Sequence, residues 1–164
     1  MAFLGIKVRR QRDGRYRVDL ESWERDLLRS LPGQLRDLLE TDDPALERLF
    51  PTAYLGDDEE TRARNEEYRR LMRGDLLARK QSALDVLEQT VDAQTLDEEQ
   101  LVAWMGAVND VRLVLGTRLD VSEDMDEDPF PDDDPRAPAY GLYVYLAHLQ
   151  EWIVQALSDG SLRR

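Results

Sequence analysis

The chain has 164 residues, a length that suits one domain with a single core, and 41% of them are hydrophobic, enough to pack an interior. Its net charge of −13 argues against free association with nucleic acid or anionic membranes, because both are polyanions. The absence of cysteine excludes disulfides, thiolate nucleophiles and metal sites that need sulfur ligands.

The sequence gives no sign of a membrane span or a secretory signal. No stretch approaches the roughly 18 apolar residues that cross a bilayer. The first ten residues, MAFLGIKVRR, place an apolar run before the basic residues, the reverse of the order in a secretory signal. We therefore predict a soluble, cytoplasmic protein with one domain over residues 1–164.

Residues 3–20 are predicted to form a β-hairpin. Apolar residues alternate with small or charged ones on both sides of an Asp13-Gly14 turn. The other face of the hairpin collects six basic residues: Lys7, Arg9, Arg10, Arg12, Arg15 and Arg17. This basic face is suited either to phosphate or an acidic partner, or to protecting an exposed sheet edge, and we favour the protective interpretation.

Residues 21–119 are predicted to be helical with short breaks. Pro32-Gly33 is expected to interrupt the first helix, and Asp43-Pro44 signals the start of a short one. Residues 57–91 indicate one long helix whose first turns are nearly all charged and project into solvent. Lys80 lies within its apolar stripe and Arg73 at the edge, so both are expected to bury their stems and expose their charges.

The segment over residues 97–119 is apolar on nearly every side, as in a helix inside a bundle. Thr95 and Glu98 have the spacing of a capping box at its start. The predicted fold class is therefore mainly α: a bundle of roughly four to six helices around this central helix, with the β-hairpin at the N-terminus.

Arg112 is the unusual residue of the central helix, because its position falls in the middle of the apolar stripe. A guanidinium there needs a partner, since an unpaired buried charge would cost several kcal/mol. Asp110 is predicted to point to the opposite side. We favour a buried ion pair that fixes helix register; the alternative is an anion pocket around Arg112, with Asn109 and Arg118 nearby. The candidate carboxylate partners on other helices are Asp75, Asp85 and Glu151.

Residues 120–138 contain nine acids and four prolines, and are predicted to form a long mobile loop. Aspartates at positions 124, 126 and 128 have the spacing that opens a calcium-binding loop. The match then fails, because Pro129 stands where that loop needs glycine and Pro135 where it needs an acid. A solvated acidic spacer is the better interpretation.

Residues 139–158 are predicted to form the last helix. Besides its main apolar stripe, this helix has a second one, which indicates contact with a neighbouring helix or with a second subunit in a homodimer. The second stripe consists of Tyr140, Tyr143, Ala147 and Val154.

The residues that carry chemistry are sparse. The single histidine, His148, has Tyr145 three residues before it, which excludes the Glu-x-x-His pairs of a di-metal helical bundle. The sequence has no Gly-x-Ser-x-Gly turn and no glycine-rich phosphate loop. We assign no catalytic, cofactor-binding or metal-binding residue and predict that the protein is not an enzyme.

Four runs of sequence resemble an actinobacterial family, the domain-of-unknown-function family 2017: LERLFPTAY, EEYRRLMRGDLLARKQSALDVLE, DEEQLVAWMGAVNDVRLVLGTRLDV and YVYLAHLQEW. The resemblance implies genes near the ClpS protease adaptor and near sulfur-carrier and cysteine-biosynthesis genes, and for some members a label of transcriptional regulator. It implies no catalytic residues. Gene proximity is association rather than mechanism.

Three functions follow as hypotheses. The leading one is a non-catalytic interaction or regulatory protein with a protein partner. The second is a DNA-binding transcriptional regulator, which only the basic hairpin supports. The third is a small-ligand-binding protein with an anion pocket around Arg112.

Overall fold

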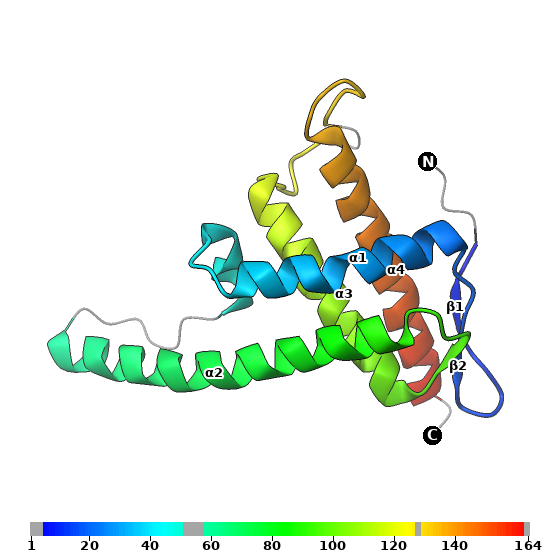
Figure 1. The fold of residues 1–164 in the computed structure, drawn as a ribbon, viewed down its shortest axis with the longest axis horizontal. Helices are drawn as coiled ribbons and strands as arrows, with labels where there is room; N and C mark the ends of the chain where they lie inside the picture. Colours follow the sequence, from blue (N-terminus) through cyan, green and yellow to red (C-terminus); the bar gives the residue numbers. More distant parts are fainter. Residues whose placement is uncertain (1–4, 51–57, 127–128, 163–164) are drawn as a thin grey trace.

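The computed structural model describes residues 5–50, 58–126 and 129–162. It is mainly helical with an N-terminal hairpin, which confirms the predicted fold class (Figure 1). In chain order the elements are β1 (Val8–Arg10), β2 (Tyr16–Val18), α1 (Ser22–Leu39), the 3₁₀ helix η1 (Pro44–Leu49), α2 (Glu59–Thr90), β3 (Thr95–Leu96), α3 (Glu98–Arg118) and α4 (Ala137–Ser161).

Helix α3 is the centre of the fold, as the sequence predicts. It packs against α2, α4, η1 and α1, and its Leu101 and Trp104 are fully buried. Its cap differs from the prediction: Asp97 accepts from the backbone of Gln100 at 2.7 Å, and the Gln100 side chain accepts from the backbone of Asp97. Thr95 is not the cap because it belongs to strand β3.

The sheet has three antiparallel strands in the order β1-β2-β3, and the third was not predicted. The pairing Val8↔Val18 and Arg10↔Tyr16 places these four residues on the inner face of the hairpin. A third strand of two residues is too short for alternation to reveal. A hairpin of two strands is only marginally stable by itself, and pairing with strand β3 explains how this hairpin is held onto the helices.

Two helices continue through residues that commonly end a helix. Helix α1 runs through Pro32, which is buried in the same stripe as Leu28 and Leu35. Helix α4 runs through Gly160, where an added Cβ would lie 2.8 Å from the Tyr16 hydroxyl. In both cases tertiary packing outweighs a local breaking signal.

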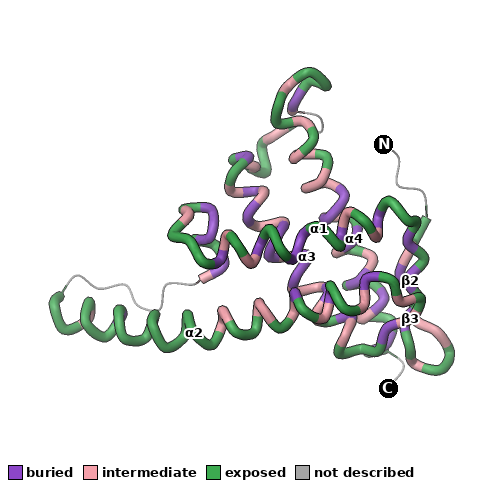
Figure 2. The backbone as a smooth tube through the Cα atoms, in the orientation of Figure 1, coloured by how far each residue is buried: buried purple, intermediate pink, exposed green. Residues whose placement is uncertain are grey.

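Helix α2 is the longest element, with 32 residues that span about 48 Å. Its second half packs on the body through Leu84 and Leu87, which are fully buried. Its first half, residues 59–74, which we call the α2 arm, extends past the body and is mostly exposed, as predicted (Figures 1 and 2). Gly74 does not interrupt the helix.

The acid-rich stretch is more ordered at its second half than the predicted mobile loop. Phe130 is only 5% exposed, its ring centroid lies 5.4 Å from that of Tyr140, and the Arg136 guanidinium lies 4.4 Å above it. Helix α4 begins at Ala137, inside the segment predicted as loop. The buried ring of Phe130 therefore anchors the stretch before α4, which composition alone predicts to be solvated.

Candidate functional site

Arg112 does not form the predicted ion pair with any described residue. It is half-buried on α3, and its Nε is buried without a hydrogen-bond partner. Of its candidate partners, Asp75 pairs with Arg79 at 3.1 Å, Asp85 pairs with Arg36 at 2.5 Å, and Glu151 is exposed. The charge of a half-buried arginine can reach solvent while its stem packs, which removes the need for a carboxylate.

The anion pocket proposed around Arg112 is not assembled either. The amide oxygen of Asn109 accepts from Gln150 of α4 at 3.1 Å. Arg118, at the C-terminal end of α3, pairs with Asp43 beside η1 at 3.1 Å. The structure therefore gives Asn109 and Arg118 separate partners and does not gather them with Arg112.

The buried ion pair of the helical core joins Lys80 of α2 to Asp110 of α3, with 3.0 Å between Nζ and Oδ1. Helical spacing places Asp110 on the side of α3 opposite Arg112. That side is where α2 packs, so the carboxylate is buried rather than solvated. Burial raises the pKa of Asp110 above its usual value, and the charge and hydrogen bond of Lys80 oppose that rise.

A second buried charge lies between the sheet, α1 and α4. Glu24 is completely buried, and its Oε2 accepts from Lys7 Nζ at 2.7 Å and from the backbone N–H of Glu21 at 2.7 Å. Its Oε1 accepts from the Tyr145 hydroxyl at 3.1 Å. Burial and the Glu24 charge together raise the pKa of Tyr145 above its usual range. The cluster ties three parts of the fold together: the segment before β1, helix α1 and helix α4.

The predicted basic face of the hairpin is not one continuous surface. Lys7 turns inward to Glu24. Arg10 lies on the inner face, where its Nε is buried and its side chain packs against Gly160. Strict alternation from Val8 places Arg10 inward, which the prediction overlooked, whereas Lys7 precedes strand β1 and turns inward because it pairs with the buried Glu24.

Two more residues of that face have partners on the sheet itself. Arg15 donates to the Thr95 hydroxyl at 3.3 Å, and Arg17 pairs with Asp19 at 2.7 Å. Arg9 and Arg12 are exposed. The protective interpretation of these charges fits this distribution better than the phosphate-binding one.

No group of three metal-ligating side chains occurs among the residues that the structure describes. The calcium-like spacing cannot be traced in full, because position 128 lies outside the described residues. Asp134 accepts from both the side chain and the backbone of Arg136, and these contacts lower the pKa of Asp134 to about 2. His148 is exposed on α4, with its ring 6.3 Å from that of Trp152.

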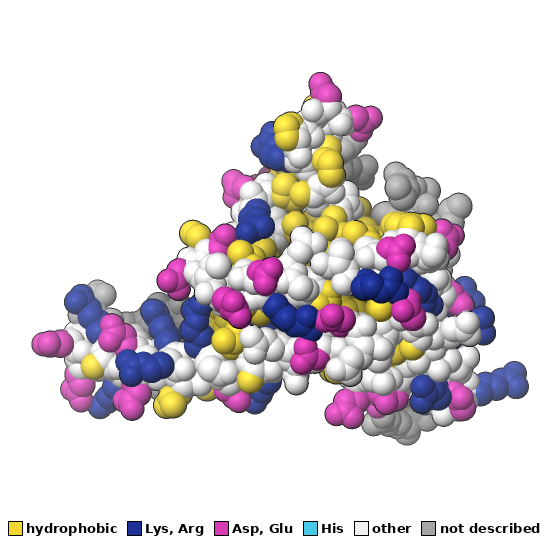
Figure 3. All heavy atoms as spheres, viewed as in Figure 1, with side chains coloured by type: hydrophobic (Ala, Val, Ile, Leu, Met, Phe, Trp, Pro, Cys, Tyr) yellow, Lys and Arg dark blue, Asp and Glu magenta, His cyan; other side chains and the backbone are white. Residues whose placement is uncertain are grey.

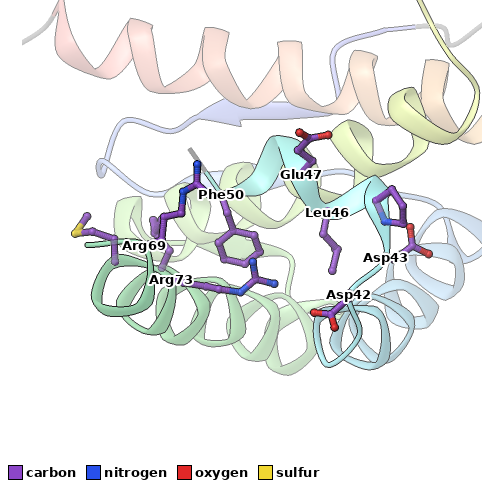
Figure 4. A pocket seen from close by; sticks show the side chains of 10 residues that line it. Asp42, Asp43, Leu46, Glu47, Phe50, Arg69 and Arg73 are labelled. Carbon is purple, nitrogen blue, oxygen red and sulfur yellow. The ribbon is translucent and has the colours of Figure 1, made fainter. Parts of the chain in front are cut away.

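The most distinctive concave surface is a groove of about 350 Å³ between η1 and the α2 arm, which we call the arm groove (Figure 4). Apolar side chains from both elements form its floor. Its α2 wall bears Arg69 and Arg73, whereas its η1 wall bears Asp42, Asp43 and Glu47. The apolar lining residues are Pro44, Leu46, Phe50, Met72 and Leu76.

Local sequence explains the two walls of the arm groove. Asp43 accepts from the backbone of Ala45 at 2.8 Å and so starts η1, with Pro44 at its first position. Residues 69, 72, 73 and 76 recur at helical spacing and therefore share one face of α2. Arg73 lies with its guanidinium carbon 4.3 Å from the centroid of the Phe50 ring, which fixes one cation above the groove floor.

A second hollow, of about 450 Å³, lies between α1 and the pair α3–α4. Its lining is mainly leucine and valine from the three helices, and Figure 3 shows hydrophobic side chains gathered there. Its polar rim consists of Gln34, Asp37, Thr41 and Arg118. The rim carries little net charge, so this hollow defines no ligand chemistry.

Comparison with known sequences defines the family. The sequence profile of a domain of unknown function, DUF2017, matches residues 5–157. The chain belongs to the DUF2017 family. This confirms the resemblance of the four sequence runs.

Three curated relatives of this DUF2017 protein have related names. It is 33% identical over 129 residues to the putative oxidative stress regulator AosR of Mycobacterium leprae, a match that covers 71% of this chain and 59% of the relative. It is 30% identical over 184 residues to the oxidative stress regulator AosR of Mycobacterium bovis and to that of Mycobacterium tuberculosis, matches that cover 89% of this chain and 84% of each relative. No solved structure matches. Among its described helices, none is long and apolar enough to cross a bilayer.

Sequence reasoning missed the burial of Glu24 and the arm groove. A glutamate in the first turn of a helix is a common capping residue, so Glu24 gave no sign of burial. The groove joins segments far apart in the chain, and only tertiary packing brings η1 beside α2. The available signals were Asp43-Pro44, which starts η1, and the helical spacing of Arg69, Met72 and Arg73.

Proposed function

We propose that this DUF2017 protein is a non-catalytic regulator of the response to oxidative stress, and that it acts in the cytoplasm by binding a partner protein. The observation that carries the proposal is its similarity, over 89% of the chain, to proteins named oxidative stress regulators. The arm groove supports the binding part, because it is an open surface with apolar and charged walls rather than an enclosed site with converging catalytic groups.

The composition limits how such a regulator could receive its signal. These 164 residues contain no cysteine, so they cannot form or reduce a disulfide. We propose that the oxidant is sensed elsewhere and that this chain transmits the signal by binding. A thiol reductant added to the purified protein is expected to leave its stability and its binding unchanged.

The DNA-binding alternative loses most of its support from the hairpin. Five of the six basic residues have partners within the fold or lie on the inner face, and the chain has a net charge of −13. A gel-shift titration at low salt is expected to give no retarded band. A band that depends on Arg9 and Arg12 would restore this alternative.

A homodimer through α4 is a further proposal from the sequence, and the packing reduces the surface available for it. Tyr143 contacts Gly116 of α3, and the Tyr140 and Tyr143 rings stack 6.1 Å apart. Of the second stripe, Val154 remains 43% exposed. Light scattering over a range of concentrations tests the dimer, and a constant monomer mass would reject it.

The proposed regulatory function is tested by deleting the gene in its native cell. Transcripts and survival are measured after a hydrogen peroxide pulse, with and without complementation by the wild-type chain. We expect the deletion to change the peroxide response and the wild-type chain to restore it. An unchanged response in the deletion strain would contradict the proposal.

A further inference from the structure

We propose that the arm groove is the docking site for an acidic segment of a partner protein, one that places an apolar side chain on the groove floor and carboxylates against Arg69 and Arg73. This inference rests on the proposed function, because it names the surface through which the regulator binds. The arm groove lies open between η1 and the α2 arm (Figure 4).

The floor of the arm groove offers a place for an apolar anchor. Met72 is 37% exposed although it lies beside the half-buried Phe50 and Leu76. Burying exposed apolar surface stabilises a complex by about 25 cal/mol for each Å² removed from water. A volume of about 350 Å³ accommodates one large apolar side chain of a partner.

The α2 wall of the groove identifies the charge of the partner. Arg69 forms no hydrogen bond or ion pair with a described residue, and the interaction found for Arg73 is its stacking on Phe50. A stacked guanidinium keeps the N–H donors at its edge available for a carboxylate. Among the described residues, neither Arg69 nor Arg73 has a carboxylate partner, so both cations are available to an acidic segment.

The opposite wall makes the groove directional. Asp42 and Glu47 are exposed carboxylates, and Asp43 is occupied by Arg118 and by the cap of η1. A bound segment therefore directs its acids towards α2 and neutral or basic residues towards η1. The same acids would repel a continuous phosphate backbone, so a protein segment fits this groove better than nucleic acid.

The arm itself supports a role in binding. Residues 59–74 extend past the body and are mostly exposed, although isolated helices of this length are only marginally stable in water. A partner that seats itself against the arm would bury part of this surface. The heptad-spaced stripe of the arm, Thr61, Asn65, Tyr68 and Met72, is uncharged, so self-association through two arms is the competing outcome that the test below separates from docking of a partner.

The test selects ligands from a random 12-residue peptide library displayed on phage and panned on the full-length wild-type protein. The charge-reversed variant Arg69→Glu/Arg73→Glu is compared with Arg62→Glu/Arg64→Glu, which changes the net charge equally on the same arm but outside the groove. Thermal unfolding of all three proteins establishes that they are equally folded.

We expect the selected peptides to combine aspartate or glutamate with a leucine, isoleucine or aromatic residue. Their affinity should fall at least tenfold in the groove variant and change less than twofold in the control variant. Met72→Glu should weaken them similarly, because it places a charge on the apolar floor.

Three outcomes would overturn the proposal: selected peptides that bind the groove variant as tightly as the wild type, self-association that the groove variant abolishes, or duplex DNA that binds through Arg69 and Arg73. These outcomes are independent of the gene-deletion experiment. A normal peroxide response in the deletion strain rejects the regulatory function even if peptides bind, whereas groove-independent peptides reject only this site.

Discussion

At the scale of single residues, Glu24 is a completely buried charge whose removal should affect stability. Replacing it with alanine would leave Lys7 without its carboxylate and the buried Tyr145 hydroxyl without its acceptor. We expect Glu24→Ala to reduce the free energy of unfolding by about 3–5 kcal/mol, the range for breaking a buried pair. Urea denaturation measures the change.

The matched control is Arg79→Ala, which breaks an exposed pair with Asp75 within one helix. Such pairs contribute less than about 1 kcal/mol. Similar losses in Glu24→Ala and Arg79→Ala would show that the Glu24 cluster does not hold the sheet to α1 and α4.

The Lys80–Asp110 pair predicts a pH dependence. In Lys80→Met, Asp110 keeps the burial that raises its pKa and loses the cation that opposes the rise. The folded state then binds a proton more tightly than the unfolded state, so its stability increases as pH falls and decreases as pH rises through the folded pKa. We expect the deficit of Lys80→Met relative to wild type to shrink between pH 7 and pH 5.

Denaturation of Lys80→Met at several pH values measures that deficit, and Lys80→Met/Asp110→Leu is its control. The double variant has no buried carboxylate, so its stability relative to wild type should vary little over the same interval. A pH-independent deficit in the single variant would mean that Asp110 is solvated when Lys80 is removed.

At the scale of elements, two glycines in helices should respond oppositely to alanine. An added Cβ at Gly74 meets no atom within 4 Å, so Gly74→Ala should stabilise α2 by about 0.5–1 kcal/mol. At Gly160 the Cβ would lie 2.8 Å from the Tyr16 hydroxyl and 3.2 Å from Arg10 Nε. Gly160→Ala should therefore destabilise the contact between α4 and the sheet.

Thermal unfolding of the two alanine variants checks this prediction, with circular dichroism to follow helix content. Gly74→Ala should raise helix content, because most of the α2 arm is exposed and its stability depends strongly on intrinsic helix propensity. If Gly160→Ala melts at or above the wild-type temperature, the close approach of α4 to Tyr16 is not a constraint.

Local sequence patterns predict the long helices of this fold and miss some of its breaks and its shortest strand. Periodicity identified α2, α3 and α4 because their stripes extend over many turns. It failed at Pro32 and Gly160, where packing against other elements overrides the breaking residue, and at β3, which has two residues. The N-terminal cap of α3 was predicted two residues too early, since Asp97 rather than Thr95 caps this helix.

At the scale of the whole molecule, the sequence predicted the fold class and the central helix, but not the candidate site. Composition and apolar periodicity determine which helix is buried, because burial follows the apolar faces. Whether Arg112 or Asp110 finds a partner depends on which helix lies on each side of α3, and no local sequence pattern contains that information. The arm groove likewise exists only because η1, which packs on α3, lies beside the α2 arm in the folded chain.

The most direct test of the account is quantitative affinity capture from native cells exposed to hydrogen peroxide, with three full-length baits compared by mass spectrometry. The baits are the wild type, Arg69→Glu/Arg73→Glu and Arg62→Glu/Arg64→Glu. We predict a partner protein that has an acidic segment containing apolar residues. This partner should be enriched on the wild type and on the control variant and lost from the groove variant. Equal recovery of every partner on all three baits would contradict it.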